Sequence, residues 1–548
     1  MDFDYLAELL FPNVSAAPAC MEARYPKRNL PEGAKVTRFA PSPTGLVHFG
    51  SLFPTRVSER LARQSGGVFF LRIEDTDSKR KVKGAVENLL EVFKYYQIEF
   101  DEGPSISGEN GFYGPYRQSE RVDIYHTYAK EMVRQGKAYP CFCTEAELGG
   151  IRTEQERLKL ERGYYGKWAK YRDADISVIK EKLNDGAPFA LRFRCESDFN
   201  NKIKFTDLIK GEMEITENDI DHVILKSDGI PTYHFAHVVD DHLMQTTHVV
   251  RGEEWLPSLP FHIQLFKSLD FKMPKYLHIS QLMKMANGSK KKLSKRDNAS
   301  SIDFYQKTGY AVDCMTEYVM TLLNSNYEEW RAANPDLKYT DFPFSIKKMS
   351  PSGCLFDFDK LNDVSRNTIS RMDAESVYSQ TLAWAEIYDN EFAVKLKEDK
   401  QYAVQILSIG RSGGKIRKDI AVWSDVKPYV SLFYDKYFTV EAEYPENFDK
   451  ADIKHTFEKF IRQYDVNDPQ DVWFEKIKTI ASELGYAPEM KIYKKNPQEY
   501  KGHVGDISMF LRIAVTGKLN SPDMYDVMKI LGRDKVIKRI DTAISELQ

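Results

Sequence analysis

Residues 35–51 read KVTRFAPSPTGLVHFGS, and this stretch decides how the chain begins to fold. The segment KVTRFA predicts a strand, and Phe53, Val57 and Leu61 then recur at the spacing of one helix face. The apolar run VFFLRI at 68–73 predicts a second strand, buried on both faces. Strand, helix and strand within about 40 residues match a βαβ unit and predict a doubly wound parallel sheet of the α/β class.

The loop between the first strand and the helix has features of a phosphate-binding site. Its glycines permit close approach of a ligand to the backbone, and the helix that Ser51 is expected to cap presents unpaired N–H groups. His48 lies beside that helix start. A proline-rich loop with an incidental histidine is an equally good interpretation of the loop alone. Neither GxGxxG nor GxxxxGK[ST] is matched here, so the dinucleotide and P-loop interpretations lack their fingerprints.

Bulk composition sets wide limits on function. The chain has 548 residues, of which 42% are hydrophobic and 29% charged, so we expect a globular protein of more than two domains. A net charge of −3 provides no global basic field. A nucleic-acid partner would therefore need local basic patches.

Cysteine usage and hydropathy indicate the compartment. Six dispersed cysteines are too few for a disulfide framework in a chain of this length. We find no apolar run of about 18 residues that would span a membrane. The start MDFDYLAELLFPN lacks the basic region of a signal peptide. The expected location is the cytoplasm.

The sheet pattern is interrupted and then resumes. Residues 118–222 are richer in charge and are interpreted as an insertion between two halves of one sheet. Strands are expected again in HVVRGEEW at 248–255 and KYLHIS at 275–280, and the pattern is helical from about residue 300 onward. Residues 1–34 are interpreted as an appended arm that carries a short amphipathic helix.

A second motif is the basic run KKKLSKR at 290–296. Such a run is more often a solvated face, and by itself we favour that interpretation. Lys292 and Lys295 are three residues apart, with glycine and serine before them. A mobile loop of this kind could close on a triphosphate and stabilise charge that develops on pyrophosphate.

Together, HFGS and KLSKR resemble the paired signature of class I aminoacyl-tRNA synthetases. Longer phrases narrow the resemblance to the bacterial-type glutamyl-tRNA synthetases over about residues 35–548. These phrases are VTRFAPSPTG at 36–45, LRIEDTD at 71–77, GPYRQSER at 114–121, LKSDGIPTYHFAHVVDDHL at 225–243, RGEEWL at 251–256 and AVTGKLNSPDMYDVMKILG at 514–532.

The resemblance implies a domain organisation. It comprises an N-terminal extension (1–34), a Rossmann-like catalytic domain (35–117 and 223–285), an inserted α+β domain for the tRNA acceptor end (118–222), a stem-contact region with the KLSKR loop (286–375) and an all-α anticodon-binding domain (376–548).

The resemblance also implies roles for individual residues. The catalytic residues would be His48, Lys292 and Lys295. ATP would be bound by His48, Gly50, Ser51, Glu254, Trp255, Lys292 and Lys295. Glutamate would be bound by Arg38, Ala40, Ser42, Glu74, Tyr233, His237 and Arg251. Many relatives have asparagine where this chain has His237, and the alternative for each arginine is a structural ion pair.

The implied reaction forms glutamyl-adenylate from L-glutamate and ATP with Mg²⁺, then transfers the acyl group to tRNA(Glu), which is expected to bind before activation. Charging of tRNA(Gln) is left open, and a monomer is expected. The motif CFC at 141–143 is similar to a zinc-binding insertion of some relatives, but Ala169 and Tyr171 stand where further ligands are needed. We therefore predict no structural zinc and no other metal site.

Three other functions compete with this one. Glutaminyl-tRNA synthetases share the fold and both signatures, although RIEDTD and YHFAHVVDDH favour the glutamyl type. A truncated relative that modifies queuosine in tRNA lacks the anticodon domain, whereas this chain is long. A catalytically inactive tRNA-binding paralogue would show decay at His48, Lys295 or the pocket arginines, and all are present.

Overall fold

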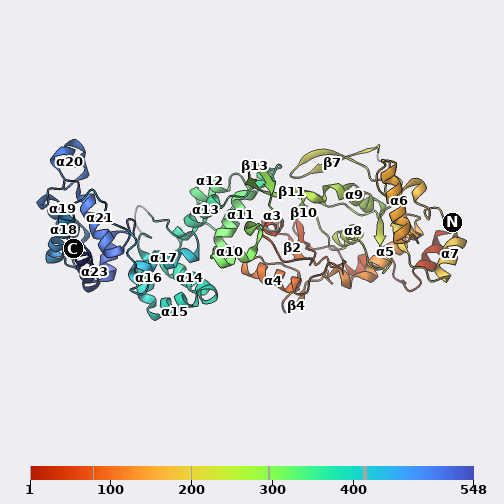
Figure 1. The fold of residues 1–548 in the computed structure, drawn as a ribbon. Coiled ribbons are helices and arrows are strands. Elements are labelled where there is room, and N and C mark those ends of the chain that lie inside the picture. Colours follow the sequence, from red (N-terminus) through yellow and green to blue (C-terminus); the bar gives the residue numbers. More distant parts are fainter. Residues whose placement is uncertain (1, 78, 199, 294–296, 412–415, 548) are drawn as a thin grey trace. The chain divides into compact units, whose positions relative to one another are not determined.

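The computed structural model describes residues 2–77, 79–198, 200–293, 297–411 and 416–547. The chain forms two compact units. The first unit comprises Met1–Ile302 and Val319–Asp357, and the second comprises Asp303–Tyr318 and Phe358–Gln548. Figure 1 shows their helices and strands.

Two βαβ units of parallel strands form the centre of the first unit. Strand β1 (Val36–Phe39) pairs in parallel with β2 (Val68–Leu71), and β10 (His248–Gly252) pairs in parallel with β11 (Lys275–Ile279). Helices α3 (Leu52–Gln64) and α9 (Leu259–Ser268) make the crossovers. The backbone N–H of Thr247 donates to the carbonyl of Val36 at 2.9 Å and joins the two pairs beside β1. The predicted parallel α/β sheet is confirmed.

The start of α3 differs from the expectation at Ser51. A turn of 3₁₀-helix (Phe49–Ser51) precedes α3, and Ser51 already has helical dihedral angles of φ −72° and ψ −23°. Its side chain makes no capping hydrogen bond, because an N-cap serine needs an extended backbone to reach the following N–H groups. The extended residue is His48, at φ −121° and ψ 160°. The predicted cap is therefore wrong.

The insertion has its own antiparallel sheet. Strand β5 (Ala138–Cys141) pairs with β6 (Ala190–Phe193), and β6 pairs with β9 (Val223–Leu225). Strands β7 (Lys202–Asp207) and β8 (Gly211–Thr216) form a separate hairpin. The sequence placed the end of the insertion at residue 222. Because β9 belongs to the antiparallel sheet, the chain returns to the parallel strands after residue 225.

The basic run begins in a strand. Strand β12 (Leu282–Ala286) pairs with β13 (Ser289–Lys292) through the two-residue turn Asn287–Gly288, whose φ angles are 53° and 74°. Asn-Gly favours this hairpin turn because both positions need positive φ. The predicted loop conformation is thus wrong for residues 290–292. Strand β14 (Cys354–Leu355), also in the first unit, pairs with β12 and interrupts the helical pattern expected after residue 300.

The N-terminal segment packs into the first unit. Helix α1 (Phe3–Leu10) lies against α5 (Val122–Arg134), and Leu6 and Leu10 are buried in its core. The Lys130 ammonium lies 2.8 Å from a Glu8 carboxylate oxygen. The appended arm expected from the sequence is therefore part of the core.

Most remaining helices belong to the second unit. These helices are α13 (Phe358–Arg371), α14 (Ala374–Tyr388), α15 (Asn390–Glu398), α16 (Lys400–Ser408), α17 (Val426–Val430), α18 (Lys450–Gln463), α19 (Gln470–Glu483), α20 (Met490–Lys495), α21 (Val504–Thr516), α22 (Met524–Leu531) and α23 (Arg533–Glu546). The apolar faces of these helices other than α20 enclose one core, which confirms the helical C-terminal region. A search of the described residues finds no helix of the length and apolarity that a membrane crossing requires.

The burial of α1 predicts the effect of truncating its leucines. Leu6→Ala is expected to lower the free energy of unfolding of the first unit by about 2–5 kcal/mol, because it leaves a cavity in a packed core. Leu9→Ala, on the same helix but only partly buried, should cost less. Urea denaturation of both variants measures the difference. Equal effects would contradict the placement of Leu6 in the core.

Candidate active site

A cavity of about 770 Å³ opens at the carboxyl ends of β1 and β10. From β1 the chain crosses to β2, and from β10 it crosses to β11, so the strand order reverses between these two strands. Ligands of open α/β sheets bind at such a switch point. The predicted residues that line the cavity are Arg38, Ala40, Ser42, His48, Gly50, Ser51, Glu74, Tyr233, Arg251, Glu254, Trp255 and Lys292.

Arg38 reaches the cavity from β1 and is held from behind. Its Nε lies 3.3 Å from Asp241 Oδ1, and its Nη1 donates to the carbonyl oxygen of Val250 at 3.3 Å. The side chain is 4% exposed. The alternative of a structural ion pair therefore applies in part, since one side of Arg38 is paired while the residue also borders the cavity.

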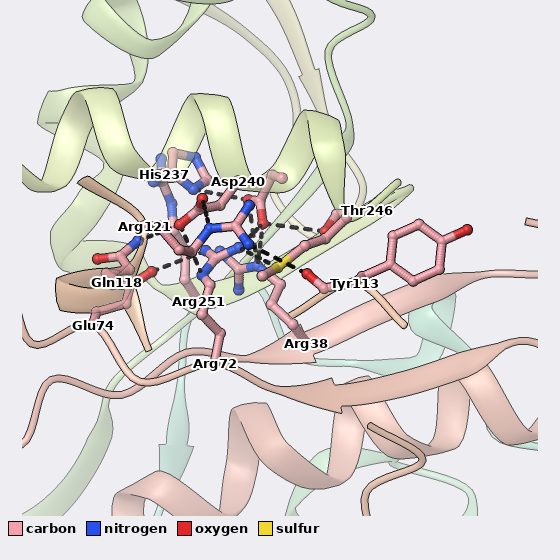
Figure 2. Close-up of polar contacts among 12 residues, drawn as sticks. Arg38, Arg72, Glu74, Tyr113, Gln118, Arg121, His237, Asp240, Thr246 and Arg251 are labelled. Carbon is pink, nitrogen blue, oxygen red and sulfur yellow. Dashed lines mark hydrogen bonds and ion pairs between the residues drawn. The ribbon is translucent and has the colours of Figure 1, made fainter. Parts of the chain in front are cut away.

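Behind Arg38 lies a buried network of charges (Figure 2). Arg72 contacts Glu74 at 2.9 Å and Asp241 at 2.7 Å, and Arg121 contacts Asp240 at 2.7 Å. Burial alone would raise the pKa of Asp241, but the neighbouring guanidinium groups hold it well below its usual range. Burial raises the pKa of Glu74 despite Arg72. Glu74 also lines the cavity, where a bound cation would favour its ionised form.

Arg251 is fixed on several sides at the end of β10. Its Nε donates to His278 Nε2 at 2.9 Å, its Nη1 lies 3.1 Å from His262 Nδ1, and its Nη2 donates to the Trp255 carbonyl at 3.3 Å. A further contact of 3.5 Å joins Nη1 to the Tyr233 hydroxyl. A guanidinium has five N–H donors, so these four contacts leave one N–H group of Nη2 for a ligand in the cavity.

The loop of 40–51 forms another wall of the cavity. A side chain at Gly50 would place its Cβ 3.0 Å from His48 Nδ1, so glycine is what allows the imidazole to lie against the backbone. The N-terminal end of α3, a helix of 13 residues, faces the same cavity through Ser51 and Phe53. The partial positive charge of a helix start favours an anion such as a phosphate.

Glu254 and Trp255 follow β10 in a short 3₁₀ segment, Glu253–Ser258. The Trp255 ring lies 4.4 Å from the ring of Tyr233, between centroids. A Cβ at Gly252 would lie 2.2 Å from Glu254 Oε2, so the Glu254 carboxylate occupies space that only glycine leaves. An aromatic surface and a carboxylate therefore stand together at this edge of the cavity.

Comparison with known proteins places these features in a family. Residues 35–335 match the family of tRNA synthetases class I (E and Q), catalytic domain, and residues 391–544 match an anticodon binding domain. A glutamate–tRNA ligase of Acetivibrio thermocellus is 49% identical over 542 residues, covering 98% of this chain and 99% of that protein. The chain belongs to the glutamate–tRNA ligase family. A glutamate–tRNA ligase from Sorangium cellulosum is 44% identical, and the match covers 97% of this chain and 99% of that protein.

A solved structure agrees with this membership. The crystal structure of a glutamate–tRNA ligase from Elizabethkingia meningosepticum, in complex with its amino acid, superposes with a TM-score of 0.74 at 28% identity. The match covers 94% of this chain and 100% of that chain. Both the family resemblance and the fold expected from the sequence are confirmed.

One predicted site residue does not line the cavity, and another lies outside the described residues. His237 is fully buried, with Nδ1 2.8 Å from Asp241 Oδ2 and Nε2 2.9 Å from the Tyr276 hydroxyl, and it is not among the described residues that line the cavity. Its ring is close enough to support Tyr233, since their centroids are 5.6 Å apart. Lys295 lies outside the described residues.

The residues that hold the pocket arginines were missed by sequence reasoning. They are Arg72, Asp241, His262 and His278. A signal was present, because Arg72 interrupts the apolar run VFFLRI and Asp240 and Asp241 follow directly on HFAHVV. A charge inside a buried element needs a partner.

The CFC segment lies beside the two positions with which it was compared in the sequence. Cys141 packs in one small cluster with Tyr139, Tyr164 and Ala169, and Cys143 and Tyr171 lie against that cluster. The positions compared in the sequence are therefore neighbours, but two of them supply no metal-binding sulfur or imidazole. In the described part of the chain, no group of three or more His, Cys, Asp or Glu side chains could hold a metal ion. The absence of zinc stays a prediction.

Buried histidines around the site predict how stability depends on pH. Burial lowers the pKa of His222, His234, His237 and His248 to about 4, from an ordinary value of 6.5. Since the folded values lie below the unfolded one, stability is fully present above pH 6.5 and is lost as the pH falls toward 4. Urea midpoints at pH 7.5, 6 and 5 should decrease in that order. A urea midpoint that does not change between pH 7.5 and pH 5 would contradict this prediction.

Proposed function

We propose that the protein attaches L-glutamate to the 3′ end of tRNA(Glu). In the first step the α-carboxylate of glutamate attacks the α-phosphate of ATP, which forms glutamyl-adenylate and releases pyrophosphate. In the second step a terminal ribose hydroxyl of the tRNA attacks the activated carbonyl and releases AMP. The observation that carries the proposal is one cavity that combines Arg38, Arg251 and Glu74 with the wall around His48.

Glutamate has two carboxylates and one ammonium group, and the cavity has matching charges. Arg38 and Arg251 suit the carboxylates, because a guanidinium pairs with a carboxylate through charge-assisted hydrogen bonds. Glu74 suits the ammonium. Ala40 and Ser42 would lie along the ligand, with the Tyr233 hydroxyl beside them.

ATP would lie along the other wall of the cavity. His48, Gly50 and Ser51 would contact its phosphates, while Glu254 and Trp255 would contact its ribose and adenine. Lys292 would stabilise the departing pyrophosphate, and Lys295 has the same proposed role from outside the described residues. Mg²⁺ would arrive bound to the triphosphate, since Glu74 and Glu254 are the carboxylates among the cavity-lining residues of the described chain.

No protein nucleophile is required for this chemistry. The attacking group belongs to the substrate, so the enzyme contributes orientation and a charge field that favours the transition state. The buried network supports this role, because side chains that are already ion-paired do not need to reorganise when the substrate binds.

The tRNA would be bound along the rest of the chain. The insertion at 118–222 is proposed to hold the acceptor end, residues 286–375 the stem, and residues 376–548 the anticodon, where an anticodon binding domain matches 391–544. We also propose that tRNA binds before glutamate is activated. A monomeric state and a cytoplasmic location remain predictions from the sequence.

A charging assay tests the proposal directly. Purified protein with ATP, Mg²⁺, radiolabelled glutamate and tRNA(Glu) should give acid-precipitable glutamyl-tRNA, and omission of tRNA should abolish pyrophosphate exchange. Replacing tRNA(Glu) by tRNA(Gln) determines whether the second tRNA is also charged. Tight tRNA binding without charging would favour the inactive paralogue, and charging with glutamine alone would favour a glutaminyl enzyme.

Arg38 is the sharpest single test of the pocket. Arg38→Ala should raise the KM for glutamate about 10- to 100-fold, since it removes a charged hydrogen-bonding partner of a carboxylate. The fold should persist, because Asp241 keeps Arg72 and His237 as partners. Steady-state charging rates at varied glutamate give the KM.

Arg28→Ala is a matched control for that variant. Arg28 is also a buried arginine, bound to both carboxylate oxygens of Glu102 at 2.6 and 2.8 Å, and it is not among the cavity-lining residues described. Its loss should reduce stability and leave the KM for glutamate unchanged. A normal KM for Arg38→Ala would remove Arg38 from the pocket.

A further inference from the structure

The pocket arginine Arg251 depends on a residue of the inserted segment. Its Nε donates to His278 Nε2 at 2.9 Å, and His278 Nδ1 lies 2.7 Å from Asp207 Oδ2. Asp207 is the last residue of β7, in the β7–β8 hairpin, whereas Arg251 and His278 belong to β10 and β11. All three side chains are buried. A continuous chain of hydrogen bonds therefore joins the hairpin to the cavity.

The Asp207 carboxylate accepts bonds on both oxygens. Oδ1 accepts the backbone N–H groups of Ile209 and Lys210, each at 2.9 Å, and Oδ2 accepts the backbone N–H of His278 at 3.1 Å as well as its ring. Burial alone would raise the pKa of Asp207, but these donors hold it below its ordinary value. The carboxylate is therefore an ionised acceptor.

An ionised acceptor on one side fixes the tautomer of His278. The ring must carry its proton on Nδ1 to donate to Asp207, which leaves the lone pair of Nε2 facing the Nε–H of Arg251. Burial lowers the pKa of His278, with a further contribution from Arg251, so the ring is neutral near pH 7. A neutral ring with its proton on Nδ1 can accept the hydrogen bond from Arg251 Nε–H. In the other tautomer, an Nε2–H donor of His278 would face the Nε–H donor of Arg251, and no hydrogen bond could form.

The hairpin itself is anchored beside the pocket. The backbone N–H of Leu208 donates to the carbonyl of Tyr276 on β11 at 3.0 Å. The Lys210 ammonium donates to Glu253 and to the Ser280 hydroxyl, next to the strand ends that line the cavity. Asp207 is thus held at a defined distance from His278.

We propose that Asp207 and His278 are positioning residues for the amino-acid pocket. They hold the Arg251 guanidinium in one orientation. Its donors to His278, His262, Tyr233 and Trp255 are then occupied, and its remaining Nη2 N–H group would be available to a substrate carboxylate. The inserted segment is accordingly a structural part of the glutamate pocket in addition to its proposed contact with tRNA. This inference rests on the proposed function.

Asp207→Asn tests the positioning role with little change of shape. Asparagine has one acceptor oxygen where the carboxylate has two, so it cannot satisfy the loop N–H groups and His278 together. If its amide faces His278, the ring proton moves to Nε2 and opposes Arg251. The KM for glutamate should rise about 10-fold or more, while the KM for ATP changes less than about twofold.

Asp221→Asn is the matched control. Asp221 is also a fully buried carboxylate of the inserted segment, paired with Arg172 at 2.6 Å and with the Tyr139 hydroxyl at 2.6 Å. Its side chain also accepts the backbone N–H of Cys195, and Arg251 is not among its hydrogen-bond partners in the described residues. This variant should lose stability in thermal unfolding and keep the wild-type KM for glutamate. A similar KM increase in both variants would show a general effect of the insertion and overturn the inference.

A double variant separates positioning from simple stability. His278→Phe keeps a ring in place but removes the acceptor of Arg251, and it serves as the test if Asp207→Asn does not fold. Because Asp207 acts through His278, Asp207→Asn with His278→Phe should raise the KM for glutamate no further than His278→Phe alone. Additive effects, or an unchanged KM in either folded single variant, would overturn the inference. Wild-type protein that fails to charge tRNA would instead refute the proposed function.

Discussion

The pairing of Asp241 with Arg38 and Arg72 is the interaction on which the rest of the site depends. Three guanidinium groups and three carboxylates are buried together behind the cavity, from Arg38, Arg72, Arg121, Glu74, Asp240 and Asp241. Removal of a member whose partner has no other counter-charge leaves an uncompensated buried charge, which typically costs about 3–5 kcal/mol, whereas Asp241 keeps Arg72 when Arg38 is lost. The charges therefore hold one another in place.

The network constrains the fold as well as the site. Arg38 belongs to β1, and Arg72 directly follows the neighbouring parallel strand β2. Asp240 and Asp241 belong to α8 (Tyr233–Leu243), and Arg121 directly precedes α5. Their contacts attach α8 and the start of the insertion to the end of β1 (Figure 2). A shift of any of these elements would break a charged contact. The position of the pocket is thus determined by electrostatics and by apolar packing together.

The two pocket arginines are held by different chemistry. Arg38 has an anion behind it, whereas Arg251 is surrounded by the neutral acceptors His278, His262 and the Trp255 carbonyl. An arginine without a paired anion attracts a substrate carboxylate more strongly in a low-dielectric site. Under the proposed function, this asymmetry would be a physical basis on which the two carboxylates of glutamate are distinguished.

The sequence by itself determined the fold class, the family and most of the residues around the cavity. Motifs such as VTRFAPSPTG and RGEEWL specify strands that end in polar residues, and side chains at the ends of adjacent parallel strands must meet. The sequence also contains two further local signals. Asn287–Gly288 indicates the β12–β13 turn, and Arg72 within VFFLRI indicates a buried ion pair.

Only the tertiary structure decided which residues stand behind the pocket. The family resemblance placed His237 among the glutamate-binding residues, yet its side chain contacts Asp241 in the interior. Asp207 had no such signal and lies 71 positions from His278, but packing of the β7–β8 hairpin on β11 brings the two within 2.7 Å. Sequence periodicity reports the environment of neighbouring residues, whereas contacts between distant segments arise from how the elements pack.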